Sequence, residues 1–170
     1  MFAAGDLVVY GGEGVCRVEG ISAPSIRGVD KAKLYYTLAP LGRSGQVMTP
    51  VDTAVLMRPV MSRREAEKLI AELGELETEA PKSSNMRGVK EYYHGIVMSY
   101  DCRQMAGLIR MTSRKRKWAL THGKKVSQMD ERYLKRAEEQ LYGELAVALE
   151  LPKAEVLPYI RQVYPGWPEE

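Results

Sequence analysis

The sequence predicts an α+β protein of two domains, a small N-terminal β-barrel over residues 1–60 and an all-α helical bundle over residues 61–170. Two observations support this division. Before residue 60, short runs of β-branched and aromatic residues are separated by glycine clusters, as in strands joined by tight turns. After residue 61, apolar residues instead recur with the period of a helix.

The N-terminal strands are short, and each ends at a turn. The run Leu7–Tyr10 precedes a glycine-rich turn, and residues 15–20 then alternate in polarity as in a half-exposed strand. Further strands are expected over residues 33–38 and 46–49, and Pro50 stops the second of them. Strands this short do not suffice for a sandwich. We therefore expect them to close a Tudor-like or SH3-like barrel, a module that binds partners and rarely catalyses reactions.

Helix signals begin directly after the predicted barrel. Ser62 and Glu65 have the spacing of a capping box, and an apolar stripe at helical spacing follows them. Residues 78–84 read as a polar linker, and a second helix is expected from about residue 87 to residue 99.

Three more helices are expected in the last part of the chain. Asp101 has the position of an N-cap, and the helix that it starts should break at residues 121–125. Ser127 begins a long helix, and Pro152 suits the first turn of a final one. Pro158 lies where the interior of that last helix would be, which argues against its continuation.

Several classes of function find no support in the sequence. No apolar run approaches the roughly 18 residues of a membrane span, and no signal peptide opens the chain, so we expect a cytoplasmic protein. The cysteines Cys16 and Cys102 are far apart, and His94 and His122 follow no ligand spacing. No nucleophile and base are paired. We therefore predict neither a metal site nor a cofactor nor an enzyme.

The positive charge of the chain is concentrated in one segment. The net charge is only +3, but residues 103–128 contain no acidic side chain. The same segment carries eight basic residues: Arg103, Arg110, Arg114, Lys115, Arg116, Lys117, Lys124 and Lys125. Such a basic end attracts phosphate backbones, although a solvated helix face next to a turn would have the same composition. Trp118 follows the basic run, and we favour an anchor in the core over stacking on a base.

A second group of candidates opens the helix expected near residue 87. Arg87 and Lys90 lie three residues apart on one face, close to a helix N-terminus that favours anions. Met86 precedes them. It could be an apolar wedge against DNA base steps, but a hydrophobic staple over the following turn is the interpretation that we favour.

The two halves together resemble the CarD/CdnL family of bacterial transcription regulators, whose N-terminal domain also occurs in the transcription-repair coupling factor. The resemblance covers most of residues 1–149. It rests on Phe2-x-x-Gly5-Asp6-x-Val8-Val9-Tyr10 with Gly14-Val15, on Val47-Met48-Thr49-Pro50, and on a C-terminal helix that contains Leu134-Lys135-Arg136-Ala137-Glu138 and Leu141-Tyr142-Gly143-Glu144-Leu145-Ala146. Many members carry a tryptophan wedge at the start of the second helix, where this chain has Met86.

The resemblance implies an adaptor in transcription. Residues 1–60 would dock on the β subunit of RNA polymerase, and the helical domain would contact promoter DNA, largely without reading sequence, and stabilise the open complex. We expect a cytoplasmic, nucleoid-associated monomer. The polymerase-binding candidates are Arg27, Val47, Met48 and Thr49. The DNA-binding candidates are Met86, Arg87, Lys90, Arg114, Lys115, Arg116, Lys117, Lys124 and Lys125.

An alternative is a KOW-like or Tudor-like module that binds RNA or the ribosome. Such a module would need basic and aromatic residues on the barrel itself. The first sixty residues carry six basic and five acidic side chains, so the predicted barrel is nearly neutral. This balance favours a protein partner for the barrel. The sequence leaves open whether transcription would be activated or repressed.

Overall fold

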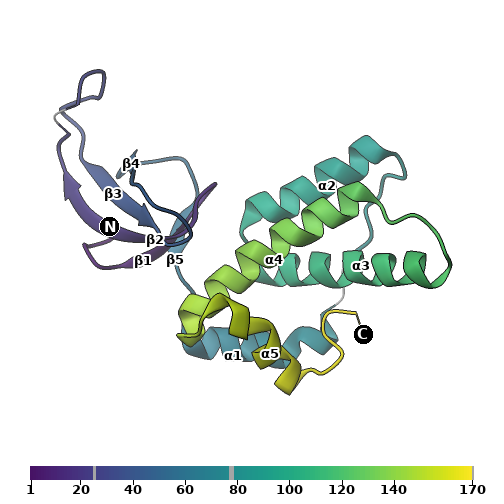
Figure 1. Cartoon of the computed structure of the whole chain (residues 1–170). Coiled ribbons are helices and arrows are strands. Elements are labelled where there is room, and N and C mark those ends of the chain that lie inside the picture. Colours follow the sequence, from purple (N-terminus) through teal and green to yellow (C-terminus); the bar gives the residue numbers. More distant parts are fainter. Residues whose placement is uncertain (25, 77–78, 170) are drawn as a thin grey trace. The chain divides into compact units, whose positions relative to one another are not determined.

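The computed structural model describes residues 1–24, 26–76 and 79–169. The chain divides into two compact units, Met1–Val60 and Met61–Glu170, which are called the β unit and the helical unit below (Figure 1). The β unit is built from strands and the helical unit from helices, which confirms the α+β class. No helix in the described part of the chain is long and apolar enough to cross a membrane.

The β unit is one antiparallel sheet with the strand order β4-β3-β2-β1-β5. Its strands are β1 (Leu7–Tyr10), β2 (Gly14–Ser22), β3 (Tyr35–Pro40), β4 (Val47–Pro50) and β5 (Met57–Pro59). The closed Tudor-like or SH3-like barrel expected from the sequence is not confirmed, because the sheet is open. Closure would require the two end strands to pair with each other. Among the described residues β4 pairs only with β3, and β5 pairs only with β1.

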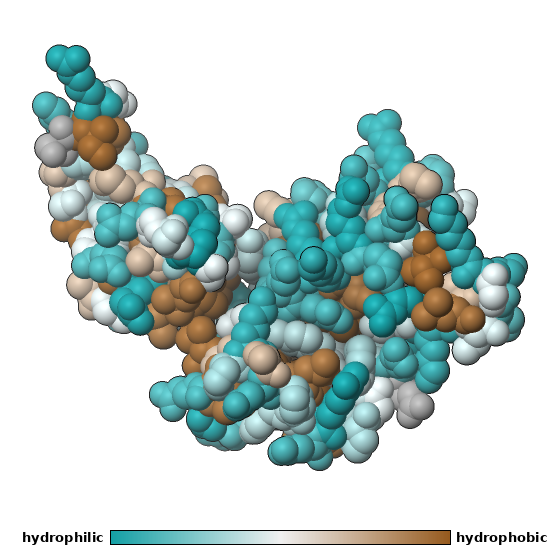
Figure 2. Space-filling view, in the orientation of Figure 1, coloured by the Kyte–Doolittle hydropathy of each residue, from teal (hydrophilic) through white to brown (hydrophobic). Residues whose placement is uncertain are grey.

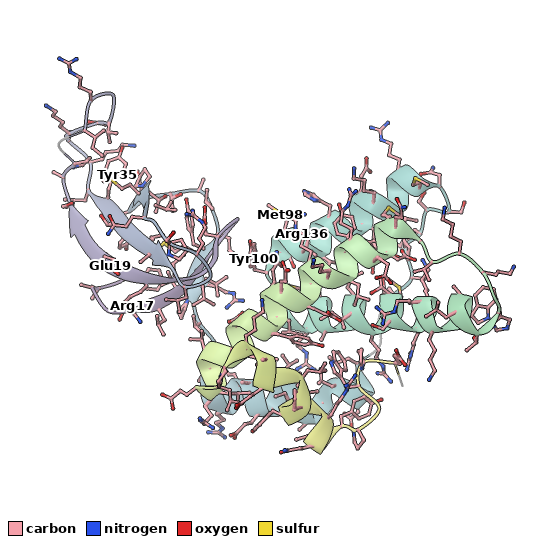
Figure 3. All side chains as sticks on the ribbon, viewed as in Figure 1. Arg17, Glu19, Tyr35, Met98, Tyr100 and Arg136 are labelled. Atoms are coloured by element: carbon pink, nitrogen blue, oxygen red, sulfur yellow. The ribbon has the colours of Figure 1, made fainter. Side chains whose placement is uncertain are left out.

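The core of the β unit follows the alternation of its strands. Val8, Cys16, Val18 and Leu38 are fully buried on one side of the sheet, whereas the intervening residues of β2 face outward, as Arg17 and Glu19 do (Figure 3). Burial raises the pKa of the Cys16 thiol to about 11, so this side chain is a neutral thiol at physiological pH.

Within the described residues, the helical unit contains five α-helices and one 3-10 turn. They are α1 (Arg63–Glu72), η1 (Leu73–Glu75), α2 (Met86–Ser99), α3 (Cys102–Thr121), α4 (Gln128–Leu149) and α5 (Lys153–Val163). Ser62 forms the predicted capping box with Glu65, and Asp101 and Ser127 cap α3 and α4 as expected. The predicted linker 78–84 begins outside the described residues. Against expectation, α5 continues through Pro158.

Helix α4 lies at the centre of the helical unit, where it packs against each of the other α-helices (Figure 1). The segment after Pro152 completes this core, because Val156, Ile160 and Trp167 are all buried. Trp167 is 1% exposed, and its Nε1 donates a hydrogen bond to the Tyr142 hydroxyl at 2.8 Å. The C-terminal segment therefore belongs to the structure of the helical unit.

Candidate nucleic-acid interface and docking edge

Three helix ends meet at one end of the helical unit. The first turn of α2, the last turns of α3 and the first turn of α4 surround a groove of about 790 Å³, which is called the helix-end groove below. Its lining includes Met86, Val89, Arg114, Lys115, Trp118, Lys125 and Asp130. The fold thus brings together candidates from two separate parts of the sequence. Figure 2 shows apolar residues exposed among hydrophilic ones on the helical unit.

Met86 is the first residue of α2, and its side chain is 76% exposed. The staple interpretation is wrong for this residue, because a staple requires burial against the following turn. Asn85 caps the helix by accepting a hydrogen bond from the Gly88 amide at 2.7 Å. A Cβ atom at Gly88 would collide with the Ser83 side chain, so glycine is needed for the chain to enter α2 in this way.

Trp118 is 52% exposed, so the expectation that it anchors α3 in the core is wrong. The buried stripe of α3 passes through Thr112 and Ala119, and position 118 lies about 100° from 119 around the helix. The indole stacks on the His122 ring with centroids 4.4 Å apart. The Lys124 ammonium lies 5.4 Å from the centroid of the indole, which is within cation–π range.

Lys115 joins three helices. Its ammonium lies 2.9 Å from Asp130 on α4 and donates a hydrogen bond to the Tyr93 hydroxyl on α2 at 3.2 Å. Burial lowers the pKa of Lys115, but the bonds to Asp130 and Tyr93 outweigh this effect, so the pKa is raised. Burial and the bond to Asp130 raise the pKa of Tyr93. Lys115 therefore helps to hold the groove together.

The other basic candidates on α3 differ in their partners. Arg116 pairs with Glu131 at 3.6 Å, and Lys117 pairs with Glu169 at 3.8 Å. Arg114 is exposed and has no ion-pair partner in the described part of the chain. Arg114 also lines the groove, so it is the cation of this run best placed to attract a ligand there.

Further cations surround the same end of the unit. Lys124 and Lys125 are exposed in the turn between α3 and α4, and Lys125 lines the groove. On α2, Lys90 is exposed, and the Arg87 guanidinium lies 3.2 Å from Glu91 while its side chain stays 91% exposed. An exposed pair of this kind is weak, so Arg87 can exchange Glu91 for a phosphate.

The cations of α4 are not among the residues that the sequence marks as DNA-binding candidates. Arg132 and Lys135 are exposed, and Arg136 Nη2 lies 3.6 Å from the sulfur of Met98 on α2 (Figure 3). These residues are surrounded in sequence by glutamates, so no local excess of positive charge marks them. Only the packing of α4 against α2 shows that Arg136 lies beside the last turn of α2.

The polymerase-binding candidates of the β unit lie on an edge strand and in a loop. Val47, Met48 and Thr49 belong to β4. Met48 is 37% exposed, but Thr49 is 2% exposed and its hydroxyl accepts a hydrogen bond from Tyr10. Thr49 therefore offers almost no surface to a partner. Arg27 is exposed in the loop between β2 and β3.

Two exposed apolar residues of the β unit were not identified from the sequence. Ile26 is 53% exposed beside Arg27, and Leu34 is 46% exposed just before β3. The Leu34 carbonyl accepts a hydrogen bond from the Val51 amide, which places Leu34 beside the end of β4. Leu34 thus adds exposed apolar surface next to the end of β4.

The comparisons with known proteins agree with this division. Residues 2–61 match the family model described as the CarD-like/TRCF RID domain, and the match includes all five strands. The N-terminal part of the resemblance seen in the sequence is thereby confirmed. All the described helices lie outside the match. No curated protein matched the chain.

Proposed function

We propose that this protein, which carries the CarD-like/TRCF RID domain in residues 2–61, is a transcription regulator that holds RNA polymerase and promoter DNA together. In this proposal the β unit docks on the polymerase β subunit, and the basic end of the helical unit contacts DNA. Both contacts together stabilise the open promoter complex. The observation that carries the proposal is the family match, because this domain is the polymerase β-interacting module.

The open edge of β4 supports a docking mode. One side of β4 is paired with β3, and no described strand pairs with the other. An edge of this kind can accept a strand from a partner by backbone hydrogen bonds. Met48 and Leu34 would add apolar contacts beside it, and Arg27, in the loop between β2 and β3, would add a charge. The nearly neutral composition of this unit also fits a protein partner better than a nucleic acid.

The helix-end groove supports the DNA contact. Arg114 and Lys125 at the groove, with Arg87 and Lys90 on α2, can bind phosphates without reading bases. Docking on the polymerase would raise the effective concentration of the helical unit at the promoter, so its contact with DNA need not be strong. The open complex is stabilised only by the difference between the affinities for open and closed DNA.

The docking proposal is tested with the full chain and purified RNA polymerase in the presence of nuclease. We expect the wild-type chain to bind the polymerase and Met48→Glu to bind at least tenfold more weakly, about 1.4 kcal/mol, because a charge would be desolvated at the edge. Val55→Glu is the matched control. Val55 is similarly exposed but lies beside Gly11 at the β1–β2 turn.

Failure of the wild-type chain to bind polymerase would refute the proposal. Recovery of ribosomes from a bacterial lysate, in place of polymerase, would favour the RNA-binding alternative. Equal weakening by the Met48 and Val55 substitutions would preserve the polymerase contact but exclude the β4 edge as its site.

A further inference from the structure

Trp118 is a large aromatic side chain that the fold leaves accessible. It is 52% exposed and lines the helix-end groove together with Met86, which is 76% exposed. Neighbouring exposed apolar side chains rimmed by polar residues mark interaction sites. Leu120 on the same helix is also exposed, but it does not line the groove. The exposed apolar side chains of Trp118 and Met86 are therefore concentrated at the helix-end groove.

The indole is held in position before any ligand arrives. Its ring is stacked on His122, and His122 Nδ1 lies 2.8 Å from the Trp118 carbonyl oxygen. Gly123 ends this turn with a positive φ of 63°, which brings Lys124 back over the indole. An aromatic surface that is already ordered loses little conformational entropy on binding.

The charge of the groove favours an anion. Arg114, Lys115 and Lys125 line it, and the only acidic lining residue among those described is Asp130. Asp130 is already paired with Lys115 at 2.9 Å. The N-termini of α2 and α4, capped by Asn85 and Ser127, also point their positive ends toward this region. A ligand with both apolar rings and negative charges matches this lining.

We propose that the helix-end groove binds a single-stranded DNA segment, with an unstacked base lying against Trp118 and neighbouring phosphates at Arg114 and Lys125. The face of a base is accessible only when the base has left the duplex stack, whereas a duplex offers phosphates and base edges. The groove volume of about 790 Å³ suits a ligand as small as a nucleoside.

This inference rests on the DNA contact of the proposed function and adds the form of DNA that the groove selects. A site that accepts unstacked bases binds melted promoter DNA more tightly than closed duplex. It would thereby supply the difference in affinity that stabilisation of an open complex requires.

The test compares three probes on the full chain. These are a short oligothymidylate, an abasic oligomer with the same number of phosphates, and a duplex of the same length. We expect Trp118→Ala to weaken oligothymidylate binding roughly 5- to 140-fold, the effect of losing one base–aromatic stack. Binding of the abasic oligomer and of the duplex should change little. Trp118→Phe should restore part of the lost affinity, and Leu120→Ala is the matched control.

Fluorescence provides a second readout. The chain contains two tryptophans, and Trp167 is buried. Oligothymidylate should quench the emission of the wild-type chain by stacking on Trp118, and the Trp118→Phe variant, which retains only Trp167, should show no quenching.

Each contrary outcome has a distinct meaning. Equal weakening on all three probes, or no effect of Trp118→Ala, would overturn base stacking at Trp118 and leave the phosphate contacts standing. A wild-type chain that binds none of the probes would overturn the DNA contact of the proposed function, and this inference with it.

Discussion

The two tryptophans of the helical unit have opposite environments. Trp167 follows α5, is 1% exposed and donates its indole N–H to Tyr142. Trp118 lies near the end of α3, is 52% exposed and stacks on His122 at the helix-end groove. One completes the core, and the other remains available to a partner. The same residue type thus has a structural role at one site and a candidate binding role at the other.

The difference arises from what covers each side chain. The segment after α5 folds back so that Trp167 joins the core that α4 organises. At the groove, Trp118 and Met86 stay more than half exposed, and cations lie beside them. Burial converts apolar area into stability, whereas exposed apolar area beside unpaired cations is available for binding. Three predictions test this contrast.

The largest effect is expected for Trp167→Ala, which should lower the free energy of unfolding by about 3–5 kcal/mol. The substitution removes a buried indole and leaves the Tyr142 hydroxyl without its donor. Urea unfolding measures the change. Trp118→Ala is the counterpart and should change the same quantity by no more than about 0.5 kcal/mol. Similar losses for both variants would remove the distinction between the two sites.

An intermediate effect is expected from reversing the charges that face the groove. The double variant Arg114→Glu, Lys125→Glu should bind DNA more weakly, and the slope of log affinity against log salt should fall by about two, one for each phosphate contact. The matched control is Arg116→Glu, Lys117→Glu, because these cations are already paired with Glu131 and Glu169. A slope that falls equally in both variants would indicate diffuse attraction without a preferred face.

The smallest effect is expected for Lys115, which contributes to stability through Asp130 and Tyr93. Its pKa in the folded state is raised above the ordinary value of 10.5, so its contribution is present below that pH. It is lost as the pH rises through the folded-state pKa. Lys115→Met should therefore destabilise the protein at neutral pH, by about 1 kcal/mol or less.

The measurement is urea unfolding of the wild type and Lys115→Met across the alkaline range, with the exposed Lys125→Met as control. The difference between wild type and Lys115→Met should shrink above pH 10.5, the ordinary lysine value. A difference that stays constant would show that Lys115 acts by packing its aliphatic stem and not by its charge.

Local signals in the sequence were sufficient for most of the elements. Ser62, Asp101 and Ser127 cap helices where the sequence predicts them, because a cap depends on residues within one turn of each other. The strand Leu7–Tyr10 and the turn after it were likewise identified from neighbouring residues. The prediction that Pro158 would end the last helix was wrong, because α5 continues past this proline to Val163.

The candidate site was predictable only in part. Residues 103–128 contain no acidic side chain, and this predicted Arg114 and Lys125 as DNA-binding candidates. The position of Met86 at a helix start made it another candidate. The sequence could not show that these residues share one groove, because they come from three different helix ends. It also could not show that Lys115 is held by Asp130, or that Thr49 is buried while Met48 is exposed.

The sequence by itself determined the α+β class, the order of the first four strands and of the helices, and the position of the basic segment, since all of these depend on local composition and spacing. It also carried the residues that match the RID domain. Only the tertiary structure decided that the sheet stays open at β4, that Trp167 is buried and that Trp118 is exposed. Burial and pairing depend on which distant segment packs against a side chain, and this information is absent from its neighbours in sequence.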